Sequence, residues 1–339
     1  MSDATQAGSA SSLVPQRAAV GFRSDLLRWR QLVSVDWLAA LLARRPVPAR
    51  PSADWQLFEV ACEGEPAYWH GHIGGARYLD TRQFEQLPHW NRVPQAALLR
   101  VLQQARIGPG TTVILYGRNM LAAARVAQLM LVAGVPDVRL LDGGLTAWCA
   151  GGHAIRQGLE PRRAEDAPAS CVARPARWQT RPDYLIDTAQ ARCMADTPGS
   201  ALVSIRTRAE YMGETSGYSY IQARGEIAGA LWGHAGSDGD VNSMCNFQDA
   251  LGRMKPAADI TALWREAGIG PQMQIAFYCG TGWRASLAFF YAWLMGWERI
   301  SVYDGGWFEW SSDPANPVRF ARQDALRGRC LPADVAAPA

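Results

Sequence analysis

The sequence predicts an α/β protein of two tandem domains, each with a mostly parallel central sheet and helices on both faces. The chain of 339 residues is too long for one average domain and suits two. It contains an internal repeat, so the two domains are expected to share one fold. Within each copy, the order strand, loop, helix, strand favours a parallel sheet covered by helices.

The internal repeat runs without a gap over about forty residues, from Ile107 to Trp148 and again from Ile269 to Trp310. The offset is constant, since 279 − 117 = 162 and 304 − 142 = 162. The matching residues are Ile107-Gly108-Pro109, Val113–Gly117, Asp142-Gly143-Gly144 and Trp148 in the first copy, and Ile269-Gly270-Pro271, Ile275–Cys279, Asp304-Gly305-Gly306 and Trp310 in the second. A period of this length indicates tandem domains rather than a solenoid of short repeats.

Each copy predicts the same elements in the same order. An apolar strand comes first, followed by a short buried strand, a tight loop, an apolar helix and a last strand before the Asp-Gly-Gly turn. The expected ranges are Leu57–Val60, Val113–Tyr116, Ala122–Ala133 and Val138–Leu141 in the first copy, and Ala201–Ile205, Ile275–Tyr278, Arg284–Met295 and Ile300–Tyr303 in the second. The second copy also carries an insertion near 213–224, whose glycines and aromatic residues suggest a loop over the pocket.

We expect five segments along the chain, and two of them are domains. They are a flexible N-terminal lead-in over 1–30, a first domain over 31–155, a linker over 156–181, a second domain over 182–320 and a C-terminal tail over 321–339. The linker is rich in Arg, Ala and Pro and shows no apolar periodicity.

The composition is that of an ordinary soluble enzyme. The formal net charge is +3 and charged residues make up 19%, so the bulk charge requires neither a nucleic acid nor a membrane as partner. No apolar run approaches the roughly 18 residues that would span a bilayer. Residues 1–20 lack the apolar core of a secretory signal, and we therefore expect a cytoplasmic location.

Seven cysteines are spread widely along the sequence, and no two of them form a Cys-x-x-Cys pair. Neither a zinc site nor a disulfide framework is expected, and the histidines show no metal-ligand spacing. A cysteine is most often a small buried hydrophobic residue. Cys279 is the exception because of its neighbours, whereas Cys171 and Cys330 are most simply incidental thiols.

Cys279 stands where the buried strand of the second copy ends and the helix begins. The carboxyl end of a parallel strand, beside a helix N-terminus, is the usual reactive position in α/β sheets. The glycines of the loop let backbone N–H groups converge, and the helix dipole favours an anion there. We therefore expect Cys279 to be a nucleophilic thiolate that could carry a persulfide. The loop residues are Cys279, Gly280, Thr281, Gly282, Trp283 and Arg284, and we expect the last five to bind the substrate or the persulfide.

The first copy lacks this chemistry. Gly117 stands where the cysteine would be, and Ala122 stands where the second copy has Arg284. The first domain is therefore expected to keep the fold and to be catalytically inactive.

The motifs of this chain resemble those of the rhodanese family. The loop from Cys279 resembles the family's Cys-x-x-Gly-x-Arg loop, and the resemblance extends over about 33–318. The other matching segments are Gly71–Ala76, Arg206–Tyr211 and Val302–Trp310. The resemblance implies two tandem rhodanese-like domains, an inactive first and an active second, and sulfur transfer through a Cys279 persulfide without a cofactor.

The chain departs from the family pattern at positions that bear on the sulfur donor. Ser204 stands where Asp is usual, Glu226 where His is usual and Ala228 where Pro is usual. The resemblance therefore implies a sulfurtransferase that moves sulfane sulfur from a donor such as thiosulfate to a thiophilic acceptor, and it leaves the donor open. The expected partners are small molecules, with a thiol-bearing protein as a possible acceptor.

Three alternatives remain. The loop is similar to that of rhodanese-like hercynine sulfurtransferases, which make ergothioneine, and this similarity implies roles for Thr281 and for Tyr220, with Tyr218 as a rival. The other two are a 3-mercaptopyruvate sulfurtransferase and a non-catalytic binding or regulatory module. Arg206 is our first candidate for binding an anionic donor, although a salt bridge to Glu210 or Glu226 is equally consistent with its position.

Overall fold

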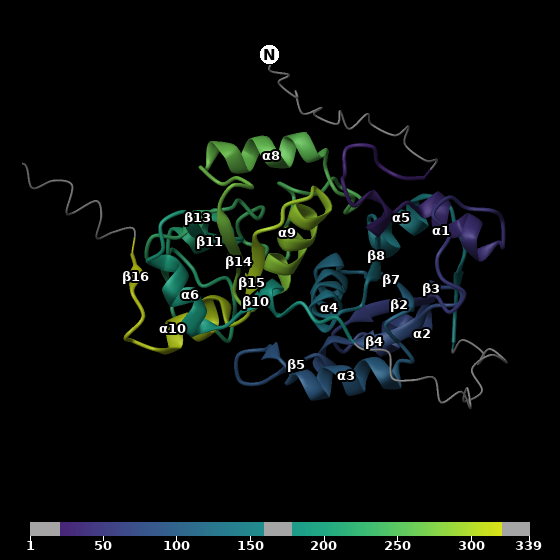
Figure 1. Cartoon of the computed structure of the whole chain (residues 1–339), viewed down its shortest axis with the longest axis horizontal. Coiled ribbons are helices and arrows are strands. Elements are labelled where there is room, and N and C mark those ends of the chain that lie inside the picture. The colour runs from purple at the N-terminus through teal and green to yellow at the C-terminus, as the bar shows by residue number, and fades with distance from the viewer. Residues whose placement is uncertain (1–20, 159–177, 321–339) are drawn as a thin grey trace, which may run out of the picture.

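A computed structural model describes residues 21–158 and 178–320, which form two α/β domains (Figure 1). Each domain contains a five-stranded, all-parallel sheet, in the order β1-β8-β7-β2-β4 in the first and β10-β15-β14-β11-β13 in the second. The two orders are equivalent, so the sequence repeat is a repeat of the fold. Residues 1–20, most of the predicted linker, the predicted tail, Cys171 and Cys330 lie outside the described residues.

The elements follow the predicted order in both domains. The first contains β1 (Leu32–Val33), α1 (Val35–Leu42), β2 (Gln56–Ala61), α2 (Glu65–His70), β3 (His72–Ile73), β4 (Arg77–Asp80), β5 (Glu85–Gln86), β6 (Asn91–Arg92), α3 (Gln95–Gln104), β7 (Thr112–Tyr116), α4 (Met120–Ala133), β8 (Asp137–Leu141), α5 (Gly144–Ala150) and β9 (Ile155–Arg156). The second contains β10 (Leu185–Ile186), α6 (Thr188–Ala195), β11 (Ser200–Ser204), α7 (Arg208–Tyr211), β12 (Glu226–Ile227), β13 (Leu231–Trp232), α8 (Ala257–Glu266), β14 (Gln274–Tyr278), α9 (Trp283–Leu294), β15 (Ile300–Tyr303), α10 (Gly306–Ser312) and β16 (Val318–Arg319).

Helices cover both faces of each sheet, which confirms the predicted fold class. Successive side chains of a strand point to opposite faces. On β14, Phe277 packs in the core that includes α8 and α9, whereas Ala276 and Tyr278 pack in a second core with α6 and α10. The strands are therefore buried on both sides, which explains why they read as continuous apolar runs in the sequence.

The two domains meet along α4 and α9, which lie side by side at the centre of the molecule (Figure 1). Every residue of α4 is buried, and residues of both helices belong to one continuous hydrophobic core. The short hairpin of β5 and β6 also extends from the first domain towards the second (Figure 1). The first copy is thus packed directly against the copy that carries Cys279.

Within residues 21–158 and 178–320, no helix has both the length and the apolar character needed to cross a bilayer.

Candidate active site

Cys279 directly follows β14, and its side chain faces the start of α9. The Gly282 backbone N–H donates a hydrogen bond to Cys279 Sγ, with a nitrogen–sulfur distance of 3.1 Å. The residue has no solvent-exposed surface. The sulfur therefore lies beside an inward-pointing amide, as the sequence predicted, but a donor can reach it only if a covering group moves.

The N-terminus of α9 is left open for an anion. Its N-cap residue is Gly282, which has a φ of +101° and no side chain to accept from the first amides. This left-handed conformation favours glycine. The first turn of a helix carries free N–H groups and a partial positive charge, which together stabilise a negatively charged sulfur.

The equivalent helix start in the first domain is closed by its own sequence. Asn119 caps α4, and its side-chain oxygen accepts a hydrogen bond from the Leu121 N–H at 2.9 Å. This cap starts α4 at Met120, two residues before the expected start at Ala122. Since Gly117 supplies no thiol either, the start of α4 has neither a cysteine at the position of Cys279 nor an uncapped N-terminus.

Arg284 is paired with a buried carboxylate, and its assignment to substrate binding stays a prediction. Its guanidinium donates to both oxygens of Glu210, at 2.7 and 2.8 Å, and both side chains are about 1% exposed. Burial acts to raise the pKa of Glu210, but Arg284 and then Arg206 lower it below its ordinary value. The pair is a buried, charge-assisted fork that fixes the first turn of α9.

Arg206 lies in the same internal network. It is fully buried, donates to the Gly225 carbonyl at 2.7 Å and lies 3.6 Å from Glu210. Its guanidinium also lies over the Trp307 ring, 5.0 Å from the centroid. These contacts favour the salt-bridge interpretation, and the assignment of Arg206 to donor binding stays a prediction.

Two departures from the family pattern compensate for each other. Ser204 donates a hydrogen bond to Glu226 at 2.7 Å, and Tyr278 donates to the other oxygen of the same carboxylate. In the first domain, Tyr116 makes the corresponding bond to Glu59, which is at the strand position equivalent to Ser204. The second domain has therefore kept the buried tyrosine–carboxylate contact while moving the carboxylate from one strand to another.

The insertion in the second domain covers the loop from Cys279 to Arg284. A methyl group placed on Gly280 would lie 2.2 Å from the Tyr218 ring, so that ring packs directly on the loop. Arg284 also donates to the Tyr218 hydroxyl at 3.1 Å. Tyr220 is 48% exposed and packs against Tyr218. Burial raises the pKa of Tyr220, and the neighbouring Thr281 side chain opposes this effect. Both tyrosines thus lie beside the loop that follows Cys279.

The first domain contributes two side chains, Glu85 and Arg125, to the surroundings of the loop, and the sequence predicted neither of them. Glu85 accepts from the Trp283 indole at 3.0 Å and from Arg125 at 2.8 Å, although the two domains are separate in sequence. Burial raises the pKa of Glu85, and Arg125 opposes this effect. The one signal in the sequence was that Arg125 is the only charged residue of α4.

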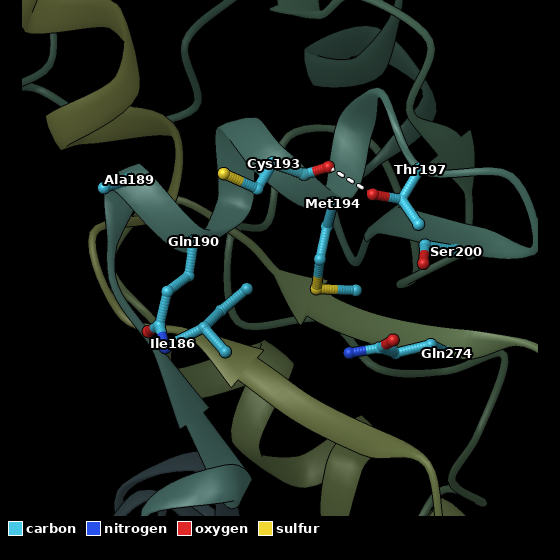
Figure 2. A pocket seen from close by; sticks show the side chains of 8 residues that line it. All are labelled: Ile186, Ala189, Gln190, Cys193, Met194, Thr197, Ser200 and Gln274. Atoms are coloured by element: carbon cyan, nitrogen blue, oxygen red, sulfur yellow. Dashed lines mark hydrogen bonds between the residues drawn. The ribbon is translucent and has the colours of Figure 1, made fainter.

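A pocket of about 410 Å³ lies elsewhere in the second domain (Figure 2). It is lined by α6 residues, including the exposed Cys193, and by Ser200 and Gln274 at the amino ends of β11 and β14 (Figure 2). Cys279 follows the carboxyl end of β14. The pocket is therefore at the opposite edge of the sheet from the catalytic loop.

Comparison with known proteins agrees with this architecture. The family model described as "Rhodanese-like domain" matches residues 34–151 and 187–313. Thiosulfate sulfurtransferase YnjE of Escherichia coli (strain K12) is 49% identical over 294 residues, which are 86% of this chain and 66% of that protein. A probable 3-mercaptopyruvate sulfurtransferase of Pseudomonas aeruginosa is 30% identical over 75% of this chain and 86% of the relative.

Solved structures show the same similarity. The crystal structure of YnjE has a TM-score of 0.80 and 48% identity, covering 87% of this chain and 69% of the YnjE chain. An anaerobic ergothioneine biosynthesis enzyme from Chlorobium limicola, in complex with trimethyl histidine, has a TM-score of 0.79 and 37% identity, covering 87% and 71%. Both proteins extend well beyond the part that matches. The two family matches span most of the described residues, and the chain therefore belongs to the rhodanese-like family, with two copies of its domain.

Proposed function

We propose that this protein is a sulfurtransferase that carries sulfane sulfur as a persulfide on Cys279, with thiosulfate as a donor. One observation carries the proposal: Cys279 Sγ accepts an amide hydrogen bond at the uncapped N-terminus of α9. An amide and a helix N-terminus stabilise a thiolate, and the same groups can stabilise a persulfide anion. The relatives named thiosulfate sulfurtransferases support the reaction class.

The reaction needs only the cysteine and two sulfur compounds. The Cys279 thiolate attacks the outer sulfur of thiosulfate, a new S–S bond forms, and the S–S bond of thiosulfate breaks. Sulfite leaves with the bonding pair, and the enzyme holds Cys–S–S⁻. An acceptor thiolate or cyanide then attacks the outer sulfur, takes it and returns the Cys279 thiolate. Charge balances at both steps, and neither an oxidant nor a cofactor is consumed.

In this proposal the two domains have different roles. The second domain supplies the nucleophile, the open helix end and the Arg284–Glu210 fork that fixes the loop. The first domain is catalytically inactive, because Asn119 occupies its helix start and Gly117 replaces the nucleophile.

The test is transfer of sulfur from thiosulfate to cyanide, measured as thiocyanate. We expect turnover by the full chain and none by Cys279→Ser. Cys245→Ser is the matched control, because Cys245 is an exposed thiol of the same domain, and it should keep full activity. Full activity in Cys279→Ser would refute the proposal, and so would the absence of transfer from thiosulfate, mercaptopyruvate and polysulfide alike.

Hercynine thiolation is a second candidate, and a specific spacing favours it. Solved structures of the protein EanB, which is 36–37% identical to this chain, contain ergothioneine or hercynine. They include variants of a tyrosine 59 residues before the persulfide-bearing cysteine and of a threonine two residues after it. Here 279 − 220 = 59 and 281 − 279 = 2, so Tyr220 and Thr281 stand at the same spacings from Cys279. In this reaction the imidazole carbon would take the outer sulfur of the persulfide and give up its hydrogen, so the cysteine thiol is regenerated.

The surroundings of the loop also suit a cationic acceptor. Both arginines nearest the loop, Arg125 and Arg284, are paired with carboxylates. Aromatic rings of Tyr218, Tyr220 and Phe308 pack in sequence beside it, with centroids 5.5 and 5.7 Å apart. Aromatic faces attract quaternary ammonium groups.

The two candidates are separated by product. With polysulfide and hercynine, the second candidate predicts ergothioneine, detected by mass spectrometry, and a loss of that product in Tyr220→Phe and Thr281→Val. Transfer from thiosulfate to cyanide should survive both substitutions. If no ergothioneine forms, the second candidate is rejected and the first stands.

A further inference from the structure

Two buried side chains of the first domain contact the catalytic loop of the second. Arg125 Nε donates to Glu85 at 2.8 Å, and the other oxygen of Glu85 accepts from the Trp283 indole at 3.0 Å. Arg125 Nη2 donates to Asp304 at 2.6 Å. The Arg125 side chain has no exposed surface, and that of Glu85 is 2% exposed. A charged group of the inactive domain is therefore desolvated against the active one.

Arg125 also packs on the residue that binds the sulfur. A methyl group placed on Gly282 would lie 3.2 Å from Arg125 Nη1 and 3.3 Å from its central carbon. Gly282 is the residue whose amide bonds Cys279 Sγ. A shift of the guanidinium therefore changes the space available to that amide.

Asp304 extends the contact to the other side of the loop. It precedes the turn into α10, whose first amides hold the loop carbonyls: Trp307 donates to Cys279 O at 2.7 Å, and Phe308 donates to Gly280 O at 3.1 Å. The Glu85–Arg125 pair therefore contacts the surroundings of the sulfur at two places. Glu85 bonds Trp283 in the loop, and Arg125 bonds Asp304 before the turn into α10.

The interface is pseudo-symmetric, which supplies an internal comparison. The Arg92 N–H donates to Asp304 and the Met254 N–H donates to Asp142, both at 2.8 Å. These bonds repeat at the offset of the sequence repeat, since 254 − 92 = 162 and 304 − 142 = 162. The two domains thus hold each other's Asp-Gly-Gly turn in the same way.

The charged pair breaks this symmetry. Leu287 occupies the position of Arg125, since 287 − 125 = 162. Gln248 occupies the position of Glu85, because each residue directly follows a buried phenylalanine. The carbonyl of that phenylalanine accepts a backbone bond from Val93 in the first domain and from the equivalent Lys255 in the second. Gln248 donates to Tyr291 and the Gly252 carbonyl within its own domain. Of these two equivalent places in the described interface, only the one facing Cys279 has the ion pair between Glu85 and Arg125.

We propose that Glu85 and Arg125 are positioning residues, supplied by the inactive domain, for the catalytic loop of the active domain. Charge-assisted hydrogen bonds between buried groups fix geometry more tightly than apolar contact does. A loop whose amide must meet one sulfur atom needs such support from outside itself. The activity part of this inference rests on the proposed sulfurtransferase function, whereas the state of the Cys279 thiol can be measured without it.

The test compares Glu85→Leu with Glu85→Gln in the full chain. Leucine cannot accept from Trp283 or Arg125, whereas glutamine keeps one acceptor oxygen. Small misplacements remote from the chemistry can cost about 10²-fold in rate. We therefore expect Glu85→Leu to lower kcat for sulfur transfer by about that factor with a smaller change in KM, and Glu85→Gln to restore it to within a few-fold. The pH midpoint of Cys279 alkylation should rise in Glu85→Leu, because the amide no longer holds the thiolate.

Gln248→Leu is the matched control. It removes a polar side chain at the equivalent position, so it should alter stability but leave kcat and the alkylation midpoint unchanged. If Glu85→Leu does not fold, Trp283→Phe removes only the indole N–H and should give a smaller loss in the same direction. Wild-type kcat and an unchanged alkylation midpoint in folded Glu85→Leu or in Trp283→Phe would overturn the inference. If the wild type itself transfers no sulfur, the proposed function fails, and the alkylation midpoints alone decide on positioning.

Discussion

Replacing Gly280 by alanine tests whether the insertion of the second domain covers the loop that follows Cys279. The new methyl group would lie 2.2 Å from one ring carbon of Tyr218, 2.4 Å from the next and 2.6 Å from the hydroxyl oxygen. Ordinary contacts of this kind are 3.4–4 Å, so the ring or the loop must move by more than an ångström. Gly280 does not have a positive φ, and the backbone itself therefore accepts alanine.

Overpacking of this kind costs about 1–3 kcal/mol. We expect Gly280→Ala to lose that much free energy of unfolding in chemical denaturation. The substitution Tyr218→Ala uncovers Cys279. We therefore expect the Cys279 thiol of this variant to be alkylated faster than that of the wild type. In the double variant the methyl group has nothing to meet, so its cost should vanish and the two substitutions should be non-additive by about 1–3 kcal/mol.

A control separates the clash from any general effect of losing a glycine. No atom comes within 4 Å of a methyl group placed on Gly110, which also lacks a positive φ. Gly110→Ala should therefore leave stability and alkylation nearly unchanged. Additive effects of Gly280→Ala and Tyr218→Ala, within about 0.5 kcal/mol, would show that the ring does not rest on the loop.

Further predictions concern the buried Glu210–Arg284 pair and the first domain. Glu210→Gln should cost about 3–5 kcal/mol in denaturation, because it leaves Arg284 buried without its counter-charge, and a cost below 1 kcal/mol would argue against the fork. The pKa of Glu210 is lower in the folded state than in the unfolded state. Its contribution to stability is therefore complete above the unfolded pKa of about 4.3 and is lost as the pH falls through the folded pKa. Melting temperatures measured over a pH series check this. The double variant Gly117→Cys, Cys279→Ser should transfer no sulfur, because Asn119 caps the helix start; measurable thiocyanate would contradict this.

The fold and the strand–loop–helix order around Cys279 could be predicted because both depend on local sequence. The gapless repeat fixes equivalent strand ends in the two copies, and the last strand of the second copy has the predicted bounds, Ile300–Tyr303. The start of α9 was missed by one residue, since Gly282 rather than Trp283 is the N-cap. Glycines beside a strand end are visible in the sequence, and they are what leave the helix end open.

The surroundings of the loop depend on contacts that local sequence does not encode. Arg284 was expected to bind the substrate or the persulfide, and the sequence did not indicate its buried partner Glu210, which lies 74 residues away. Glu85 and Trp283 are 198 residues apart. Pairings over such distances follow from how the two sheets and α4 are packed, and the sequence offered only the isolated charge of Arg125 as a sign of them.

The most direct test of the account is mass spectrometry of the full chain after exposure to thiosulfate without an acceptor. The peptide containing Cys279 should gain the mass of one sulfur atom and lose it again when cyanide is added. The variant Cys279→Ser should gain none. Sulfur found instead on another cysteine, such as the exposed Cys245, or on no cysteine at all, would contradict the claim that the open helix end of the second domain holds a persulfide.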